Sequence, residues 1–246
     1  MKPRVIAIIP ARHESRRFPG KPLAVISGKL LIEHIYCEIS KSKLVDKVIV
    51  ATDSDEIYTA VAEFGGIAIL TSKKHKTGSD RSAEAMTKTG GDIMVSIQAD
   101  HIGLKRADYD CVLKAMIHDS KIKYATIIKG IESEDQLFDP NRVKVIFDRN
   151  KNALWFSRYP LPYLQGLDGD YLSHHNFFYH IGVYFFRKMA LLNFHDWPQG
   201  RFERAESLEQ LRMLENHQKI RLFETKSEIY SIDTPEDLAK LKNVVL

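Results

Sequence analysis

Residues 8–23 bring four cations into one short polar stretch that follows an apolar run. The stretch reads IIPARHESRRFPGKPL, and its cations are Arg12, Arg16, Arg17 and Lys21. A glycine-containing loop of this kind suits a triphosphate, because backbone N–H groups and side-chain cations can neutralise phosphate oxygens together. The loop matches neither GxxxxGK[ST] nor GxGxxG, so a P-loop or a dinucleotide-binding turn is not indicated. The alternative interpretation is a solvated basic loop.

Two aspartates follow apolar, strand-like runs at positions where a carboxylate would face a ligand. Asp100 ends the segment VSIQAD, and Asp233 begins DTPED after Tyr230-Ser231-Ile232. Two such carboxylates could hold Mg²⁺, which prefers oxygen ligands together with substrate phosphates. The alternatives are a loop carboxylate at Asp100 and a helix N-cap at Asp233, and spacing alone favours the cap.

Other polar residues are weaker indications of a metal or catalytic site. The segment Asp53-Ser54-Asp55 has the DxD form that nucleotide-sugar glycosyltransferases use for metal, but it directly precedes a predicted helix, so capping is the preferred interpretation. His180 lies in a strand-like pattern, where a lone histidine is more often structural. No Cys/His cluster has the ligand spacing of a zinc site.

Strands and helices must alternate to position these residues. Apolar runs predict strands at 5–9, 45–51, 67–70 and 93–97, and periodic segments predict helices at 30–40, 55–64, 78–89 and 108–118. Such alternation is typical of βαβ units around a parallel sheet. In that architecture ligands bind at the carboxyl ends of the strands, which is where the conspicuous polar stretches lie.

The second half has a different character. It predicts strands at 124–129, 143–147, 153–157 and 180–186, an irregular stretch at 159–176 and a single helix at 205–217. A turn-rich connection at 148–152 joins two of the strands. Asp233 or Thr234 followed by Pro235 predicts a helix start, because Asp and Thr are good N-caps and proline is favoured in the first turn.

Length and composition are typical of a globular protein. The 246 residues are 44% hydrophobic and 28% charged, and the net charge is only +4. Cations gather only at 12–21 and 73–76, so a small polyanion is expected as ligand and no nucleic acid or membrane as partner. The two cysteines, Cys37 and Cys111, are expected to be buried thiols of a reducing compartment. The first apolar run is too short for a signal peptide, so a cytoplasmic location is expected.

Several motifs in order along the chain resemble one enzyme family. The stretch PARHESRRFPGKPL is similar to the PARxxSxRxPGKPL loop of the CMP-Kdo synthetase (3-deoxy-manno-octulosonate cytidylyltransferase) family. The resemblance continues over nearly the whole chain through VIVATDSDEI, HKTGSDRSAEA, VSIQAD, VKVIFDRNKNALWFSRYPLPY, HIGVYFF, ESLEQLRMLENHQKI and SIDTPEDL.

The resemblance implies a fold and an activity. The fold would be an α/β, three-layer, Rossmann-like nucleotide-binding domain of the nucleotide-diphospho-sugar transferase type, with a mixed sheet and a β-rich dimerisation and substrate part. One domain would span 1–246, with CTP binding mainly in 1–120 and sugar binding and dimer contacts in 121–246. The activity would be Mg²⁺-dependent transfer of CMP from CTP to a 2-keto-3-deoxy sugar acid, with release of pyrophosphate. The family is homodimeric and acts in lipopolysaccharide biosynthesis in the cytoplasm of Gram-negative bacteria.

The resemblance also implies roles for residues, and matching motif positions gives four sets. The catalytic set is Arg12, Arg17, Lys21 and Asp100. The CTP-binding set is Arg12, Ser15, Arg17, Lys21, Thr77, Gly78, Ser79, Arg81 and Gln98. The sugar-side set is His101, Arg158, His180, Tyr184, Glu209 and Gln210, in which Arg158 would pair with the sugar carboxylate. The metal set is Asp100 and Asp233.

One segment departs from the family pattern. The family reads Gln-Gly-Asp-Glu-Pro where this chain reads Gln-Ala-Asp-His-Ile at 98–102. The metal aspartate is kept, but His101 replaces an acid beside the expected sugar site. The sugar acid therefore stays open: a modified octulosonate such as an amino-sugar variant and a sialic-acid-like sugar are alternatives. Two further alternatives are a glycosyltransferase that uses Asp53 and Asp55, and a non-catalytic nucleotide-sugar-binding paralogue.

Overall fold

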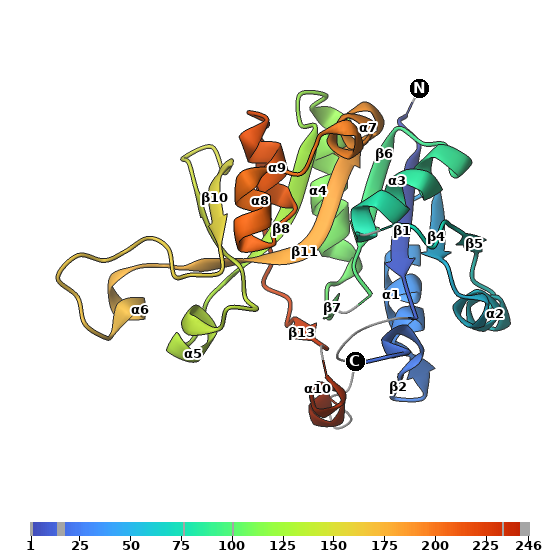
Figure 1. Ribbon diagram of the computed structural model, residues 1–246, viewed down its shortest axis with the longest axis horizontal. Helices are drawn as coiled ribbons and strands as arrows, with labels where there is room; N and C mark the ends of the chain where they lie inside the picture. The colour runs from blue at the N-terminus through green and yellow to red at the C-terminus, as the bar shows by residue number, and fades with distance from the viewer. Residues whose placement is uncertain (1, 14–17, 76, 100, 233, 242–246) are drawn as a thin grey trace.

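The computed structural model describes residues 2–13, 18–75, 77–99, 101–232 and 234–241. Within them, nine strands form one sheet around which the helices pack (Figure 1). Four strands of the first half are parallel neighbours in the order β6-β1-β4-β5. They are β1 (Val5–Ala11), β4 (Lys47–Thr52), β5 (Ala68–Leu70) and β6 (Ile93–Ile97). The predicted parallel sheet is confirmed.

Strand β1 shows why the sheet is covered on both faces. All seven of its residues are buried. Val5, Ala7 and Ile9 pack into the core on one face, and Ile6 and Ile8 pack into the core on the other. Because successive strand side chains point to opposite faces, a continuous apolar run needs helices on both sides.

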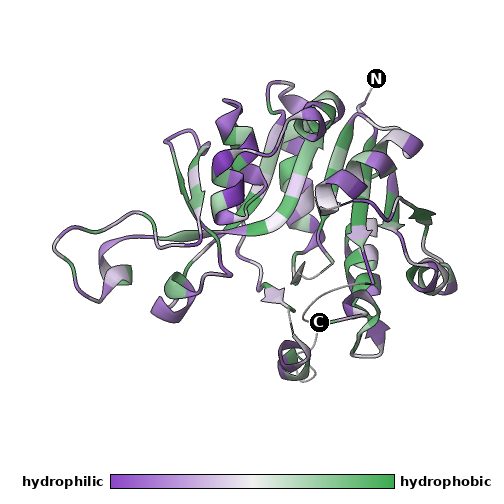
Figure 2. Ribbon diagram, viewed as in Figure 1, coloured by the Kyte–Doolittle hydropathy of each residue, from purple (hydrophilic) through white to green (hydrophobic). Residues whose placement is uncertain are grey.

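The helices divide between the two faces accordingly. The core on one face includes side chains from α1 (Leu31–Ser40), α2 (Asp55–Glu63) and α4 (Arg106–His118). The core on the other face includes side chains from α3 (Gly78–Thr89), α7 (Lys188–Asp196) and α9 (Gln210–Glu215). The chain is therefore three-layered, and apolar residues are concentrated in the strands (Figure 2).

The second half extends the same sheet with antiparallel strands. Strand β11 (Phe178–Arg187) runs antiparallel to β6, β8 (Tyr124–Gly130) and β9 (Lys144–Phe147). β10 (Ala153–Ser157) pairs with β9, and β12 (Ile220–Glu224) runs parallel to β8. The segment from β10 through α6 (Tyr171–His174) to β11 extends away from the rest of the chain, as Figure 1 shows.

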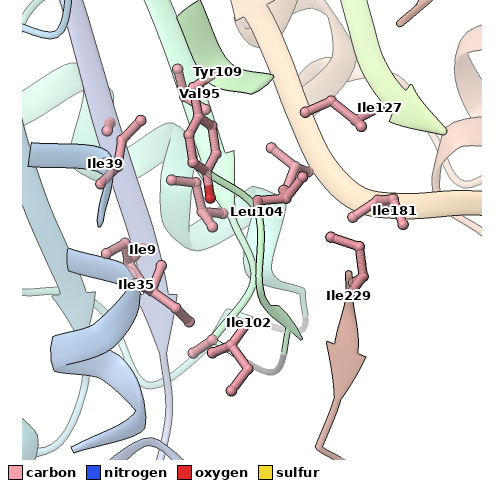
Figure 3. Packing of buried hydrophobic residues seen from close by; sticks show 14 of the residues in the cluster. Ile9, Ile35, Ile39, Val95, Ile102, Leu104, Tyr109, Ile127, Ile181 and Ile229 are labelled. Atoms are coloured by element: carbon pink, nitrogen blue, oxygen red, sulfur yellow. The ribbon is translucent and has the colours of Figure 1, made fainter. Parts of the chain in front are cut away.

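Small elements complete the fold. They are η1 (Lys21–Leu23), the pair β2 (Val25–Ile26) and β3 (Lys29–Leu30), α5 (Glu134–Phe138), α8 (Arg201–Glu206), α10 (Pro235–Leu241), and the pair β7 (His101–Ile102) and β13 (Tyr230–Ser231). Ile102 packs near Ile35 of α1, while Leu104 lies beside Tyr109 of α4 (Figure 3). No helix among the described residues is long and apolar enough to cross a membrane.

Two sequence predictions are wrong. The single helix at 205–217 is instead α8 and α9, separated at Ser207, whose φ of 54° is left-handed and ends α8. Cys37 is partly exposed and Cys111 is exposed, and both are free thiols. On α4 the buried stripe is Tyr109, Val112, Leu113 and Met116, and residue 111 falls outside that helical face.

Candidate functional site

The candidate site begins where β1 and β6 end. These strands are parallel neighbours, with Ile8 opposite Ser96, so their carboxyl ends reach the same edge of the sheet. Two small adjoining cavities of about 110 and about 120 Å³ lie there. Both cavities are lined by Pro10, Ala11, Arg12 and Gln98. The first is also lined by His75, Thr77, Gly78 and Arg81, and the second by Lys21, Pro22 and Ala99. Six predicted CTP-binding residues are thus brought together: Arg12, Lys21, Thr77, Gly78, Arg81 and Gln98.

The amino terminus of α3 forms one wall of the first cavity. Thr77 caps the helix: its hydroxyl accepts from the Asp80 amide at 3.1 Å, and its own amide donates to the Asp80 carboxylate at 3.3 Å. At Gly78, an added Cβ would lie 3.2 Å from the Gln98 amide nitrogen and 3.3 Å from Pro10. Glycine therefore allows the helix to begin close to the strand ends. The unpaired N–H groups and the dipole of such a helix end favour an anion.

Arg81 lies on the inner side of the same helix and is 3% exposed. Its guanidinium donates to the Asp53 carboxylate at 2.6 Å and to the Thr71 hydroxyl at 2.5 Å. Asp53 therefore pairs with an arginine, and the cap of α2 is the Ser54 hydroxyl, which accepts from the Ile57 amide at 3.3 Å. The DxD segment thus caps a helix, as preferred, but through its serine.

Four predicted residues connect α3 to α9 and β11. The Ser79 hydroxyl donates to the Glu209 carboxylate at 2.7 Å, and burial raises the pKa of Glu209 to about 7. The neighbouring Gln210 accepts from the Tyr184 hydroxyl at 2.9 Å. Burial raises the pKa of Tyr184 well above its ordinary value, so this hydroxyl keeps its proton. The Gln210 side-chain nitrogen has no hydrogen-bond partner within the described ranges, so this cluster holds one unused donor.

His180 and Arg158 lie further along the second half. The His180 ring contacts the Thr126 hydroxyl at 2.8 Å and lies 5.1 Å from the Tyr184 ring, which joins it to the preceding cluster. Arg158 follows β10, and its side chain donates to the carbonyls of Glu206 at 2.8 Å, Pro140 at 3.0 Å and Ser207 at 3.4 Å. It is not among the residues that line the cavities described here.

A larger cavity of about 460 Å³ lies between the start of β11, β13 and α10. Of the predicted residues in the described ranges, only His180 lines it. The sequence analysis did not single out the polar residues beside it, which include Asn141, Arg142, Asp237 and Lys240. The sequence signal for Asn141 and Arg142 is a polar turn just before the strand at 143–147, but this turn does not follow a parallel strand.

Several predicted residues are not described. Ser15, Arg17, Asp100 and Asp233 lie outside the described residues, and the side chain of His101 is also outside them. The backbone of His101 pairs with Ser231, and Ile102 pairs with Tyr230, in the β7–β13 ladder. After that ladder Thr234 caps α10, with its hydroxyl accepting from the Asp237 amide at 3.3 Å. Within the described ranges no group of three or more His, Cys, Asp or Glu side chains is placed to hold a metal.

Comparison with known proteins identifies the family of this chain. The cytidylyltransferase family model matches residues 6–220. A 3-deoxy-manno-octulosonate cytidylyltransferase from Thermodesulfovibrio yellowstonii is 44% identical, over 95% of this chain and 94% of that protein. One from Syntrophus aciditrophicus is 41% identical, over 99% and 98%.

A solved structure has the same fold. It is a CMP:2-keto-3-deoxy-manno-octonic acid synthetase complexed with CTP, and it superposes with a TM-score of 0.90 at 36% identity over 97% of each chain. That likeness extends over the nucleotide cavities and the antiparallel second half alike. The chain therefore belongs to the 3-deoxy-manno-octulosonate cytidylyltransferase family, whose members are nucleotidyltransferases.

Proposed function

We propose that this protein transfers CMP from CTP to 3-deoxy-manno-octulosonate and releases pyrophosphate. The observation that carries the proposal is the pair of cavities at the ends of β1 and β6, which bring Arg12, Lys21 and the start of α3 together. The CTP complex of the 36% identical synthetase, which covers 97% of this chain, supports CTP as the nucleotide.

The chain's own groups suit a nucleotide triphosphate. Arg12 and Lys21 neutralise phosphate oxygens as charge-assisted donors, and the N–H groups that follow Thr77 add dipoles of the same sign. Gln98 supplies a side-chain amide between the two cavities, where it can bind the nucleoside. Arg17 and Ser15 belong to the same loop by resemblance. Since these groups bind and neutralise phosphates and form no covalent bond to them, catalysis is mainly positioning and charge stabilisation.

The reaction is a single displacement. The anomeric hydroxyl of the sugar releases its proton to solvent, and its oxygen forms a bond to the α-phosphorus as the bond from that phosphorus to the bridging oxygen breaks. Pyrophosphate leaves with the negative charge that Arg12 and Lys21 stabilise. By resemblance, we propose that the nucleotide and the sugar acid are surrounded by Ser79, His101, Arg158, His180, Tyr184, Glu209 and Gln210.

Mg²⁺ would be held by Asp100 and Asp233, whose carboxylates are the oxygen donors that it prefers. Asp100 adjoins His101 in sequence and Asp233 is two residues beyond Ser231, and His101 pairs with Ser231 in the β7–β13 ladder. This connectivity supports one shared site, since consecutive Cα atoms are only about 3.8 Å apart. When bound, Mg²⁺ supplies charge neutralisation on the phosphates.

CTP binding to the two cavities has a direct test. Lys21→Ala should weaken CTP binding by about 1.5–3 kcal/mol, the range of a charge-assisted hydrogen bond, in titration calorimetry. Lys43→Ala is the matched control, because Lys43 is exposed and outside both cavities. Equal CTP affinity in the Lys21 and Lys43 variants would remove Lys21 from the nucleotide site.

We also propose a homodimer formed through the projecting segment between β10 and β11. The side chains of Tyr159 and Tyr163 on this segment are 75% and 82% exposed. Large exposed aromatic side chains often mark a surface that a partner protein covers. In sedimentation velocity the wild type should sediment as a dimer, and a variant carrying Tyr159→Ser and Tyr163→Ser should shift toward the monomer. A monomeric wild type at micromolar concentration would refute the dimer.

A further inference from the structure

The 460 Å³ cavity has the size and chemistry of a site for a small polar ligand. Its lining includes two cations, Arg142 and Lys240, and two carboxylates, Asp139 and Asp237. Hydroxyl and amide groups, such as those of Ser231, Thr234 and Asn141, complete the polar lining. A sugar acid carries one carboxylate and several hydroxyls, so a cation of this lining suits its carboxylate, and the aspartates and Asn141 suit its hydroxyls.

The cavity also adjoins the place where the reaction would occur. Ser231 and Thr234 line it and stand on either side of position 233 in the sequence, and His180 lines it from β11. Ser231 belongs to the ladder with β7, whose first residue follows Asp100. A sugar bound here would therefore lie beside the two predicted metal positions.

Arg158 is the expected partner of the sugar carboxylate, but its guanidinium is already engaged. All three of its nitrogens donate to backbone carbonyls: Nε to Glu206, Nη1 to Pro140 and Nη2 to Ser207. Two of these carbonyls are at the end of α8, where an arginine can satisfy groups that have no helical partner. To bind a carboxylate with its fork, Arg158 would have to release them.

The guanidinium of Arg142, unlike that of Arg158, lies against an aromatic ring. Its carbon lies 4.9 Å from the centre of the Tyr179 ring, so the ring supports the guanidinium by a cation–π contact. The Arg142 Nε forms an ion pair with the Asp139 carboxylate at 3.9 Å, a distance longer than a hydrogen bond. Asp139 instead accepts from the backbone and side-chain nitrogens of Asn141, at 2.8 and 3.1 Å.

The segment that precedes Arg142 is held by hydrogen bonds from two cationic side chains, Lys144 and Arg158. The Lys144 ammonium donates to the Asp139 carbonyl at 2.9 Å, and Arg158 donates to the carbonyl of the next residue, Pro140. Lys144 is fully buried, and burial, assisted by Arg158, lowers its pKa to about 8. Two buried or half-buried cations thus anchor residues 139–140, and Arg142 follows two residues later at the cavity wall.

We propose that Arg142 binds the carboxylate of the sugar acid in this cavity, and that Arg158 is a positioning residue that holds the Arg142 segment through Pro140. A planar fork bound by two parallel hydrogen bonds matches a carboxylate better than an ammonium does. The inference rests on the proposed function, because it assigns the sugar of that reaction to a particular cation.

The test compares Arg142→Ala, Arg142→Lys and the control Arg149→Ala in steady-state pyrophosphate release. Arg149 is an exposed arginine on the turn between β9 and β10 and is outside the cavity. Arg142→Ala should raise the KM for 3-deoxy-manno-octulosonate by about 10- to 100-fold, the factor for losing a charge-assisted pair, and leave the KM for CTP within about twofold. Arg142→Lys should recover only part of the loss.

A substrate analogue separates carboxylate binding from a general effect on structure. The C1 amide of the sugar acid has no charge for Arg142 to bind, so wild type and Arg142→Ala should use it equally poorly. CTP affinity by calorimetry confirms that each variant is folded, and Arg142→Gln serves if the alanine variant is not. Equal sugar KM values in the Arg142 and Arg149 variants would overturn the inference alone, whereas a wild type that releases no pyrophosphate with any 2-keto sugar acid would overturn the proposed function.

Discussion

Glu209 has surroundings unlike those of a carboxylate in water. Its side chain lies between α3 and α9, where desolvation raises its pKa to about 7, partly offset by the hydrogen bond from Ser79 and by the charge of Arg212. An unfolded glutamate titrates near its ordinary value of 4.5. Between these values the folded protein holds a proton that the unfolded protein has released.

Protein stability should therefore fall as pH rises through that window. The folded state binds more protons there, so the free energy of unfolding decreases with increasing pH from the unfolded to the folded pKa. Glu209→Gln cannot ionise and should flatten this decline in urea unfolding at about pH 5 and about pH 8. Glu63→Gln, at an exposed position on α2, is the control and should keep the wild-type decline. A Glu209→Gln protein with the same decline as wild type would show that Glu209 does not titrate in this range.

At the scale of elements, the β7–β13 ladder is expected to position the predicted Mg²⁺ site. Gly103 follows β7 with a φ of 112°, and a Cβ there would lie 1.9 Å from the Glu228 carbonyl oxygen just before β13. A methyl group at that point must push the two segments apart. Since the ladder adjoins both predicted metal positions in sequence, separation should disturb the Mg²⁺ site more than the nucleotide cavities.

Gly103→Ala should lower kcat on the order of tenfold to a hundredfold, because a small misplacement of reacting groups is costly. It should also need more Mg²⁺ for half-maximal rate, with CTP affinity little changed. The matched control is Gly130→Ala at the end of β8, where an added Cβ meets no atom within 4 Å. Wild-type rates and Mg²⁺ dependence in Gly103→Ala would mean that the ladder does not position the metal site.

Elements with strong local signals could be predicted from sequence. The α3 helix and β6 were predicted with the bounds that they have, because Thr77 is a good cap and 93–97 is a continuous apolar run. The helix at 205–217 was wrong because Ser207 carries no sequence signal for the left-handed conformation that divides it. The α7 helix and β12 were not predicted, since each is short: nine residues in α7, with buried Ala190, Leu191 and Phe194, and five residues in β12.

At the scale of the whole molecule, one sheet joins two kinds of site. The parallel strands β1 and β6 end at the two small cavities. The antiparallel strand β11 is the neighbour of β6 in the same sheet, and its first residues line the larger cavity. That Arg12, Lys21 and Gln98 lie together could be predicted from the sequence, because these residues follow parallel strands. Arg142 could not, because it comes before an antiparallel strand and reaches its cavity only through long-range packing with β13 and α10.

The most direct test of the proposed reaction is pyrophosphate release by the purified wild-type protein with CTP, Mg²⁺ and 3-deoxy-manno-octulosonate, run beside a panel of amino-substituted octulosonates and sialic-acid-like sugars. Release should require CTP, a 2-keto-3-deoxy sugar acid and Mg²⁺, and Asp100→Asn should abolish it while CTP binding persists. No release from CTP with any of these acids, or undiminished release by Asp100→Asn, would contradict the assignment of this chain as a metal-dependent sugar-acid cytidylyltransferase.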